Sequence, residues 1–589
     1  MYDESIQHAL RRSKIQPVEF EVPYLTHLLQ NFRGASPHSV ILTGTAGDGK
    51  TYLCRKIWEG LGGDHGIWES DDKIRRLTLA EGHCLTVIKD LSELRDEDRS
   101  FLAHMADAIC GQNSLDVFLV ASNDGQLVEA WNGTPDSPSV IRVRGLIEDL
   151  LVSEQSCRDS YDLILYNLSR TAAAGLLDAI LKAVLEHPDW AGCSGCRGQG
   201  ESTADRCPIW ENYARLQQPL FQERLHNLIE LCDHSEYHLP IRQLLQLTSN
   251  LLLGHAGVKD RLLRCADIPH VVSKKQVALA SPYSNVFGEN LASTRRDTIE
   301  VFEILRRFGI GEETSNRIDN LLIYGNDDAT IRGLFDELVR VDAIYGGGDH
   351  YLDLQAAYLE GEEPETYQEI CETFLHELRR QRQRLFFTMP STYVESLQLW
   401  HLTVFQFAGE YLQKVLAVLQ SNVRPSRDIL MRLVRGLNRV ITGMLTNDEQ
   451  YLILATSGSY SQAHVSRLEE ALIAVQPNRG QRVMLELRDK HHVYLSVYLD
   501  RDIPSVNLPL HLVRYEFLSR VAEGALPSSF SRECYEDLLA FKGRLLREHR
   551  RLVHGYRERH PNPDEEFTLK LLELDERGFV RSRSIELQF

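Results

Sequence analysis

The feature that most constrains the fold is a glycine-rich loop between a short apolar run and an amphipathic segment. Val40, Ile41 and Leu42 form a run typical of a buried parallel strand, and residues 52–61 carry apolar side chains at helical spacing. The stretch that joins them, GTAGDGKT at residues 44–51, matches G-x-x-x-x-G-K-[ST] at every fixed position. Strand, loop and helix in this order predict an α/β domain with a phosphate-binding loop at one edge of a parallel sheet.

The positions of this loop have separate expected roles. Glycines let the backbone curl so that successive N–H groups face a phosphate, and the following helix adds its positive N-terminal end. Lys50 would reach the β- and γ-phosphates of ATP, and the hydroxyl of Thr51 would bind Mg²⁺. The remaining members of the predicted cradle are Gly44, Thr45, Ala46, Gly47, Asp48 and Gly49. The competing interpretation is a glycine-rich turn that contains Lys-Thr by chance, and the flanking strand and helix argue against it.

Two further apolar runs end in polar residues that suit hydrolysis. The run CLTVIK is followed by Asp90, a carboxylate that would hold Mg²⁺ through water. Glu93, or with less support Asp96, would polarise the attacking water, although the usual adjacent Asp-Glu pair is missing. The run DVFLVAS is followed by Asn123, whose amide would orient water against the γ-phosphate. The competing interpretation is that Asp90 and Asn123 only cap helices.

This order of phosphate loop, Asp-ended strand and Asn-ended strand resembles the AAA+ class of P-loop ATPases. The resemblance runs from about residue 15 to about residue 270 and gives Asn123 the sensor-one place. It implies a helical lid after Arg170 and a lid arginine that touches the nucleotide, for which Arg242 is the candidate. It also implies an arginine finger from a neighbouring subunit, for which the candidates are Arg142, Arg144 and Arg170.

A cysteine cluster interrupts the predicted lid. Cys193, Cys196 and Cys207 form a C-x₂-C pair followed by a third cysteine, in a stretch rich in Gly, Ser and Asp. Thiolates at this spacing bind one tetrahedral Zn²⁺, and we expect the site to be structural because it is separate from the phosphate loop. The candidates for the fourth ligand are His187, which is nearest, and Cys232 or His226. The competing interpretation is a polar loop without metal, or one with a redox role.

Length and net charge limit the number of domains and the kinds of partner that we expect. A chain of 589 residues is too long for one core, and a net charge of −19 argues against a surface that is basic throughout. No apolar run reaches the length of about 18 residues that spans a bilayer, and the first residues lack the layout of a secretion signal. Most of the eleven cysteines are scattered, which fits a reducing compartment. We therefore expect a cytoplasmic protein with no membrane partner.

The sequence predicts four segments and a mainly helical second half. The pattern RVMLELRDKHHVYLSVYL predicts a β-hairpin, and residues 451–455 predict another strand. The segments are an ATPase core at 1–170, a helical lid with the cysteine-rich insert at 171–270, a helical connector at 271–365, and a mainly helical α+β C-terminal domain at 366–589.

Three clusters of basic residues, here called basic runs, lie in the second half of this acidic chain. Their members are Arg379, Arg380, Arg382 and Arg384; Arg432, Arg435 and Arg439; and Lys542, Arg544, Arg547, Arg550 and Arg551. Each run alone is typical of a solvated helix face paired with acids. Together they favour contact with a DNA or RNA backbone, and the stripe of Arg432, Arg435 and Arg439 is the best candidate because its spacing puts it on one helix face.

Several later stretches add a second resemblance. NDGQL, the C-x₂-C followed by CPIWEN, SPYSNVFGENL and RYEFLSRVAEGALPSSFSRECYEDLLAFK resemble the DptF family, the ATPase subunits of DNA phosphorothioation-dependent restriction. The resemblance implies an ATP-hydrolysing subunit of a bacterial anti-phage complex that acts on DNA with two partner proteins, as an oligomer or a monomer. The alternative is a nucleotide-gated signalling or scaffold protein that controls a partner effector without binding DNA.

Overall fold

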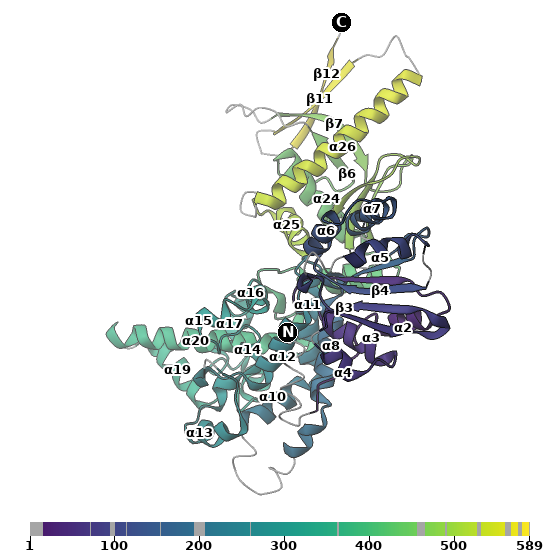
Figure 1. Cartoon of the computed structure of the whole chain (residues 1–589). Coiled ribbons are helices and arrows are strands. Elements are labelled where there is room, and N and C mark those ends of the chain that lie inside the picture. Colours follow the sequence, from purple (N-terminus) through teal and green to yellow (C-terminus); the bar gives the residue numbers. More distant parts are fainter. Residues whose placement is uncertain are drawn as a thin grey trace. The chain divides into compact units, whose positions relative to one another are not determined.

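The structure is a computed structural model in which the chain divides into two compact units (Figure 1). The described residues are 16–70, 72–94, 100–112, 115–153, 155–193, 207–258, 261–361, 364–455, 466–488, 492–526, 532–559, 567–574 and 580–587. The first unit contains residues 1–233, 237–307 and 326–388, and the second contains residues 234–236, 308–325 and 389–589.

A five-stranded sheet of order β2-β3-β4-β1-β5 forms the centre of the first unit. Its strands are β1 (Ser39–Thr43), β2 (Ile74–Thr78), β3 (Cys84–Ile88), β4 (Asp116–Ala121) and β5 (Leu163–Asn167). Four of them run parallel, and β2 pairs antiparallel with β3 at the edge of the sheet. The predicted strands at 40–42, 85–88 and 117–121 are confirmed within β1, β3 and β4, and the α/β fold class is confirmed with them. The sequence did not predict β2.

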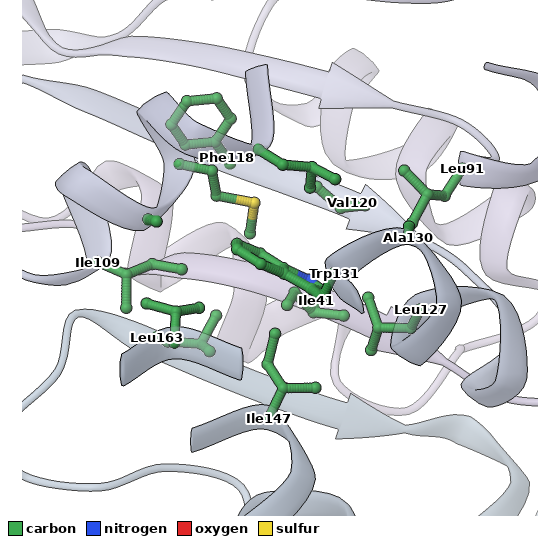
Figure 2. Close-up of a cluster of buried hydrophobic side chains, with 14 of the residues drawn as sticks. Ile41, Leu91, Ile109, Phe118, Val120, Leu127, Ala130, Trp131, Ile147 and Leu163 are labelled. Atoms are coloured by element: carbon green, nitrogen blue, oxygen red, sulfur yellow. The ribbon is translucent and has the colours of Figure 1, made fainter. Parts of the chain in front are cut away.

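Helices cover both faces of this sheet (Figure 1). One face carries α2 (Leu25–Arg33), α3 (Lys50–Gly60) and α4 (His65–Glu69), and the other carries α5 (Phe101–Ile109), α6 (Asp124–Asn132) and α7 (Pro138–Ser153). Side chains alternate between the two cores, as a strand requires: Val40 and Leu42 pack with Trp58, whereas Ile41 faces Trp131 of α6. Figure 2 shows Trp131 among aliphatic side chains from β1, β4, β5 and α7. Burial on both faces holds the strand ends in fixed positions.

Helices make up the rest of the first unit. They are α8 (Ala173–Leu185), α10 (Pro208–Leu216), α11 (Pro219–Asp233), α12 (Ile241–Leu253), α13 (Ile268–Ser273), α14 (Pro282–Asn285), α15 (Ser293–Arg296), α16 (Glu300–Arg306), α18 (Arg332–Phe335), α19 (Asp349–Glu360) and α20 (Pro364–Thr388). α8 packs against α11 and α12, and α20 packs against α11 and α14. α20 belongs to this unit, whose last segment ends at Thr388.

The second unit contains more β-structure than the sequence indicated. Its helices are α17 (Asn316–Tyr324), α21 (Ser391–Val394), α22 (Ala408–Glu410), α23 (Ala417–Gln420), α24 (Arg427–Thr442), α25 (Leu512–Glu523) and α26 (Arg532–Arg559). Its strands are β6 (Tyr451–Ala455), β7 (Ser466–Ala474), β8 (Arg482–Arg488), β9 (His492–Tyr498), β10 (Val506–Pro509), β11 (Phe567–Leu574) and β12 (Val580–Leu587).

These strands form two antiparallel sheets, β10-β9-β8 and β12-β11-β7-β6. The predicted hairpin is β8 with β9, and the strand predicted at 451–455 is β6, so both are confirmed. A mainly helical domain with one hairpin was therefore an incomplete description. The missed strands β7 and β12 carry many charged residues, which in β12 face solvent, whereas Glu469 and Glu470 of β7 are only 6% and 13% exposed and pair with Lys570 and Arg550.

No helix within the described ranges combines the length and the apolar composition that crossing a bilayer requires.

Candidate functional site

The loop at residues 44–51 joins β1 to α3 in a conformation that its glycines permit. Gly44, Gly47 and Gly49 have φ of +141°, +107° and +85°, in the region that side chains other than glycine rarely adopt. Thr45 and Ala46 form the exposed tip of the loop. α3 begins at Lys50, so the unpaired N–H groups of its first turn and its positive end meet the loop. This is the local geometry of an anion-binding helix N-terminus.

The ammonium of Lys50 lies at the centre of this site. Its Nζ donates hydrogen bonds to the carbonyl oxygens of Gly44 (2.7 Å) and Thr45 (2.8 Å) and to Oδ1 of Asn123 (2.7 Å). Burial lowers the pKa of Lys50, and the charges of Asp48, Asp90 and Asp124 oppose that effect. The structure thus brings the expected lysine and the expected strand-end amide into direct contact.

Asp90 and Asn123 follow β3 and β4 at the edge of the sheet where β1 ends, because the three strands are parallel. Oδ1 of Asp90 accepts hydrogen bonds from N (2.9 Å) and Oγ (2.7 Å) of Ser92, so this residue caps a short 3-10 helix as well as acting electrostatically on Lys50. The side chain of Asn123 does not cap α6. The capping interpretation therefore fits Asp90 in part and does not fit Asn123.

Sequence reasoning missed Asp124 and Asn167. Asp124 is the first residue of α6, and its charge acts on Lys50. Nδ2 of Asn167, the last residue of β5, lies 3.4 Å from Oδ2 of Asp124. The signal was present in the sequence, since Asp124 directly follows Asn123 at a strand end.

The structure connects Glu93 to the site around Lys50 less directly than it connects Asp90 and Asn123. Its side chain is exposed in the short 3-10 helix Leu91–Glu93, and its backbone carbonyl accepts a hydrogen bond from Nζ of Lys73. Asp96 lies outside the described residues. Asp124 therefore joins Glu93 as a carboxylate that could act on a water molecule.

Asp48 lies behind the loop and is only 2% exposed in its side chain. Its Oδ2 accepts from N of Thr45 (2.6 Å) and from Oγ of Ser169 (2.8 Å). Its Oδ1 lies 2.6 Å from Nε2 of His238, which belongs to the segment between α11 and α12. The loop is thereby bonded to the end of β5 and to the helical part of the same unit.

A small, mostly apolar pocket adjoins this contact. It is lined by Val22, Pro23, Tyr24, Asp48, Leu168, Thr171, Leu176, His238, Leu239 and Ile241. The lining comes from the segment before α2, from the end of β5 and from the helical part, so three parts of the first unit meet beside the loop.

The arginines expected near the nucleotide differ in their surroundings. N of Arg242 donates to the carbonyl of Gly47 (3.2 Å), so this residue lies directly beside the loop. Arg144 donates to the carbonyls of Trp131 and Thr134 and to Asp136 and so has internal partners. Nε of Arg142 donates to the carbonyl of Pro138, a residue of its own helix. Nη2 of Arg170 donates to the carbonyl of Leu151.

Part of the cysteine cluster lies outside the described residues. Cys193 and Cys207 flank the segment 194–206, which contains Cys196 and is not described. Within the described ranges, no three His, Cys, Asp or Glu side chains form a metal-binding group. Nε2 of His187 is buried and has no hydrogen-bond partner in the described part of the chain, and its Nδ1 accepts from N of Asp189 (3.3 Å). The structure therefore does not bring the described ligand candidates His187, Cys193 and Cys207 into one group, and the unpartnered ring nitrogen of His187 is the feature here that fits a metal ligand.

The two alternative ligands have other surroundings. Cys232 is fully buried in α11, and this burial raises the pKa of its thiol well above the ordinary value. Nδ1 of His226 lies 2.8 Å from Oδ2 of Asp178. Of the three candidates, His187 therefore has the environment that best suits a zinc ligand.

Most of the basic side chains that we expected to face a polyanion are bonded within the chain. In the run around α20, Arg379 pairs with Glu289, and Arg384 donates to Gln381 and to the carbonyl of Leu338. In α24, Arg432 pairs with Glu410 and Arg435 with Glu449, and Arg439 donates to the carbonyls of Thr446, Val521 and Ala522. The stripe at Arg432, Arg435 and Arg439 is therefore a set of internal contacts and offers no free phosphate-binding face.

The third run is different because much of α26 is exposed. Lys542 is buried, but Arg544, Arg547, Arg550 and Arg551 are exposed. Arg550 pairs with Glu470 and Arg551 with Glu548, whereas Arg547 has no ion-pair partner among the described residues. An open hollow on the helix is lined by Gly543, Leu546, Arg547, Arg550, Arg551 and His554. α26 thus carries the one exposed basic face among the three runs within the described ranges.

Comparison of the chain with protein-family models, with curated proteins and with solved structures finds no match. The interpretation of the site depends on its residues and their geometry.

Proposed function

We propose that this chain is an ATPase of the AAA+ class that binds ATP with Mg²⁺ on the 44–51 loop and converts ATP and water to ADP and phosphate. The observation that carries the proposal is the position of the Lys50 ammonium, which bonds two loop carbonyls and the Asn123 amide. In ATP-bound protein this ammonium turns to the β- and γ-phosphates, while the amides of the loop and of α3 surround them. We place the base against the apolar side chains of Tyr24, Leu176 and Leu239, whose pocket has a free volume of about 10 Å³ and must enlarge for the base to enter.

The donor set at the sheet edge fits Mg²⁺. Thr51 lies in the first turn of α3, and the charge of Asp90 reaches Lys50 in the same site. Hydroxyl and carboxylate oxygens are the ligands that this cation prefers, and we assign its binding to Thr51 and Asp90. When bound, Mg²⁺ neutralises phosphate charge that develops during transfer.

We assign the remaining steps of ATP hydrolysis to the side chains of Asn123, Glu93 and Arg242. Asn123 orients the attacking water, since its amide already lies beside Lys50. Glu93 polarises that water, and Asp124 is the competing candidate because its charge acts on Lys50. Arg242, held against the loop through Gly47, senses the γ-phosphate from the helical part.

Matched amide substitutions distinguish the roles of the two carboxylates, Glu93 and Asp124. We expect Glu93→Gln to bind ATP normally and to hydrolyse it on the order of 100-fold more slowly, because the polarising carboxylate is lost while the phosphate cradle is kept. Single-turnover hydrolysis of radiolabelled ATP measures the chemical step directly. Wild-type turnover by Glu93→Gln together with slow turnover by Asp124→Asn would transfer the role to Asp124.

The wider role that we propose is that of the ATPase subunit in a bacterial anti-phage restriction complex, acting in the cytoplasm on DNA together with partner proteins. The resemblance to the DptF family supports it, as does the exposed basic face of α26. A neighbouring copy would supply the arginine finger in an oligomer. Of the candidates, Arg144 is already bonded to three internal acceptors, whereas Arg142 is exposed, which favours Arg142 over Arg144.

One observation favours the alternative of a nucleotide-gated scaffold that controls a partner without binding DNA. Two of the three basic runs are bonded internally, so less cationic surface is free than the sequence indicated. ATP turnover measured with and without DNA, in the presence of the partner proteins, separates the two functions. Stimulation by DNA supports the restriction subunit, and equal rates support the scaffold.

We also propose a structural zinc ion held by Cys193, Cys196, Cys207 and His187. The orphaned Nε2 of His187 supports the fourth ligand. Elemental analysis of the purified protein should find about one zinc per chain, because three thiolates in one segment bind Zn²⁺ better than harder metals. His187→Ala should lower this content, whereas Cys232→Ala should not. Protein without zinc would refute the site, and loss of zinc only in Cys232→Ala would change the fourth ligand.

A further inference from the structure

The carboxylate of Asp48 is an unexpected group in a loop that would surround phosphates. It is almost completely buried and receives hydrogen bonds on both oxygens. Thr45 and Ser169 bond Oδ2, and His238 bonds Oδ1 at 2.6 Å. Burial acts to raise the pKa of Asp48, but its hydrogen bond with His238 and the charge of that imidazole lower it, and the net pKa lies below the ordinary value. His238 therefore stabilises the ionised form of Asp48.

The imidazole of His238 lies between charges from two other elements. Asp48 approaches it from the loop, and the charge of Asp233, at the end of α11, also interacts with it. Asp233 in turn accepts hydrogen bonds from N of Ala173 (3.0 Å) and N of Ala174 (3.1 Å) at the start of α8. The contact therefore connects the loop to α8 and α11.

A second set of contacts joins the same two parts of the first unit. N of Arg242 donates to the carbonyl of Gly47, and a Cβ placed on Gly47 would lie 3.1 Å from Cβ of Arg242. A Cβ on Gly49 would lie 3.1 Å from Cδ1 of Ile241. The start of α12 thus packs directly on the loop, and His238 provides the charged contact in this junction.

We propose that Asp48 and His238 form a latch by which residues 237–242 hold the loop in its nucleotide-binding conformation. The inference rests on the proposed nucleotide site and assigns both residues as positioning residues. While His238 is in contact, its hydrogen bond with Oδ1 stabilises the negative charge of the carboxylate behind the loop. When the contact opens, the buried negative charge of Asp48 is left beside the incoming phosphates and repels them. Nucleotide binding and docking of residues 237–242 therefore strengthen each other.

The latch predicts a particular pattern in a double-mutant cycle. His238→Ala should weaken ATP binding about tenfold, because Asp48 remains buried and uncompensated. Asp48→Asn should bind at least as tightly as wild type, since the repulsive charge is gone, the amide oxygen keeps the bonds from Thr45 and Ser169, and the amide NH₂ can donate to Nε2 of His238 in its other tautomer. The double variant Asp48→Asn/His238→Ala should bind like Asp48→Asn, so the second change rescues the first. If His238→Ala weakened ATP binding only by disturbing the packing around residue 238, adding Asp48→Asn would not restore the affinity.

The cycle is measured on the full chain by titration with a fluorescent ATP analogue and Mg²⁺. His38→Ala is the matched control, because His38 forms a His–Asp pair with Asp162 (3.4 Å) before β1, at the opposite edge of the sheet. It should leave affinity unchanged. Wild-type affinity in His238→Ala, or a double variant as weak as His238→Ala, would overturn the latch while the nucleotide site stands. A folded wild-type chain that does not bind the analogue would overturn the proposed function and the latch with it.

Discussion

Lys50→Ala should reduce ATP turnover to the background rate while the protein stays folded. The substitution removes the ammonium at the mouth of the loop that bonds Gly44, Thr45 and Asn123. Losing a preorganised charge that faces developing phosphate charge costs on the order of 10²–10³ in rate, and weaker ATP binding adds to this loss. The carbonyls that lose their donor lie at an exposed loop, where water can replace it, so the free energy of unfolding should change by only about 1 kcal/mol.

Lys56→Ala provides the matched control for this change. Lys56 lies in the same helix, but its Nζ pairs with Glu19 at 2.7 Å and has no bond with the loop. Phosphate release should therefore continue at the wild-type rate in this variant. Equal turnover in Lys50→Ala and wild type would show that the loop does not bind phosphate as we propose.

Charge reversal on α26 should have the second large effect, provided that the chain acts on DNA. Arg544, Arg547 and Arg551 are exposed and lie three and four residues apart, which puts them on one side of the helix. Replacing all three by Glu should weaken DNA binding by on the order of 100-fold at low salt, since each lost phosphate contact removes released counterions. The slope of log K against log salt should flatten by about one per contact. Filter binding of labelled duplex DNA across a salt series measures both quantities.

A control with the same change in net charge is available in the first unit. Arg76, Lys274 and Arg332 are exposed there, and their combined reversal to Glu should leave the salt slope unchanged. If both triple variants weaken binding equally, the effect is one of overall charge. If neither does, α26 is a solvated helix face and the scaffold function gains support.

The sequence predicted those features that are encoded by a short contiguous pattern and missed those that depend on residues far apart in the chain. The loop and the strands β1, β3 and β4 were predictable because each is a contiguous apolar or glycine-rich pattern. The contact between Lys50 and Asn123 was also accessible, since parallel strands bring their carboxyl ends to one edge. The pairing of Asp48 with His238 was not, because the two residues are 190 positions apart, Asp48 occupies a variable position of the loop motif and His238 belongs to no motif.

The wrong expectations share a physical cause. Helical spacing correctly placed Arg432, Arg435 and Arg439 in one helix, but periodicity does not report what lies opposite that helix. Glu410 and Glu449 lie there and pair with two of the three arginines. In the same way, β2 was missed because its sequence IRRLT carries two arginines, one of which is buried and bonded to backbone carbonyls.

The most direct test of the central claim is a titration of the purified full-length chain with ATP and Mg²⁺ under single-turnover conditions, with bound nucleotide and released phosphate both measured. The account predicts about one ATP per chain, saturation below about 1 mM, and conversion to ADP and phosphate, with binding and conversion both lost in Lys50→Ala. A folded wild-type protein that binds no ATP at that concentration, or that retains binding and turnover in Lys50→Ala, would contradict it.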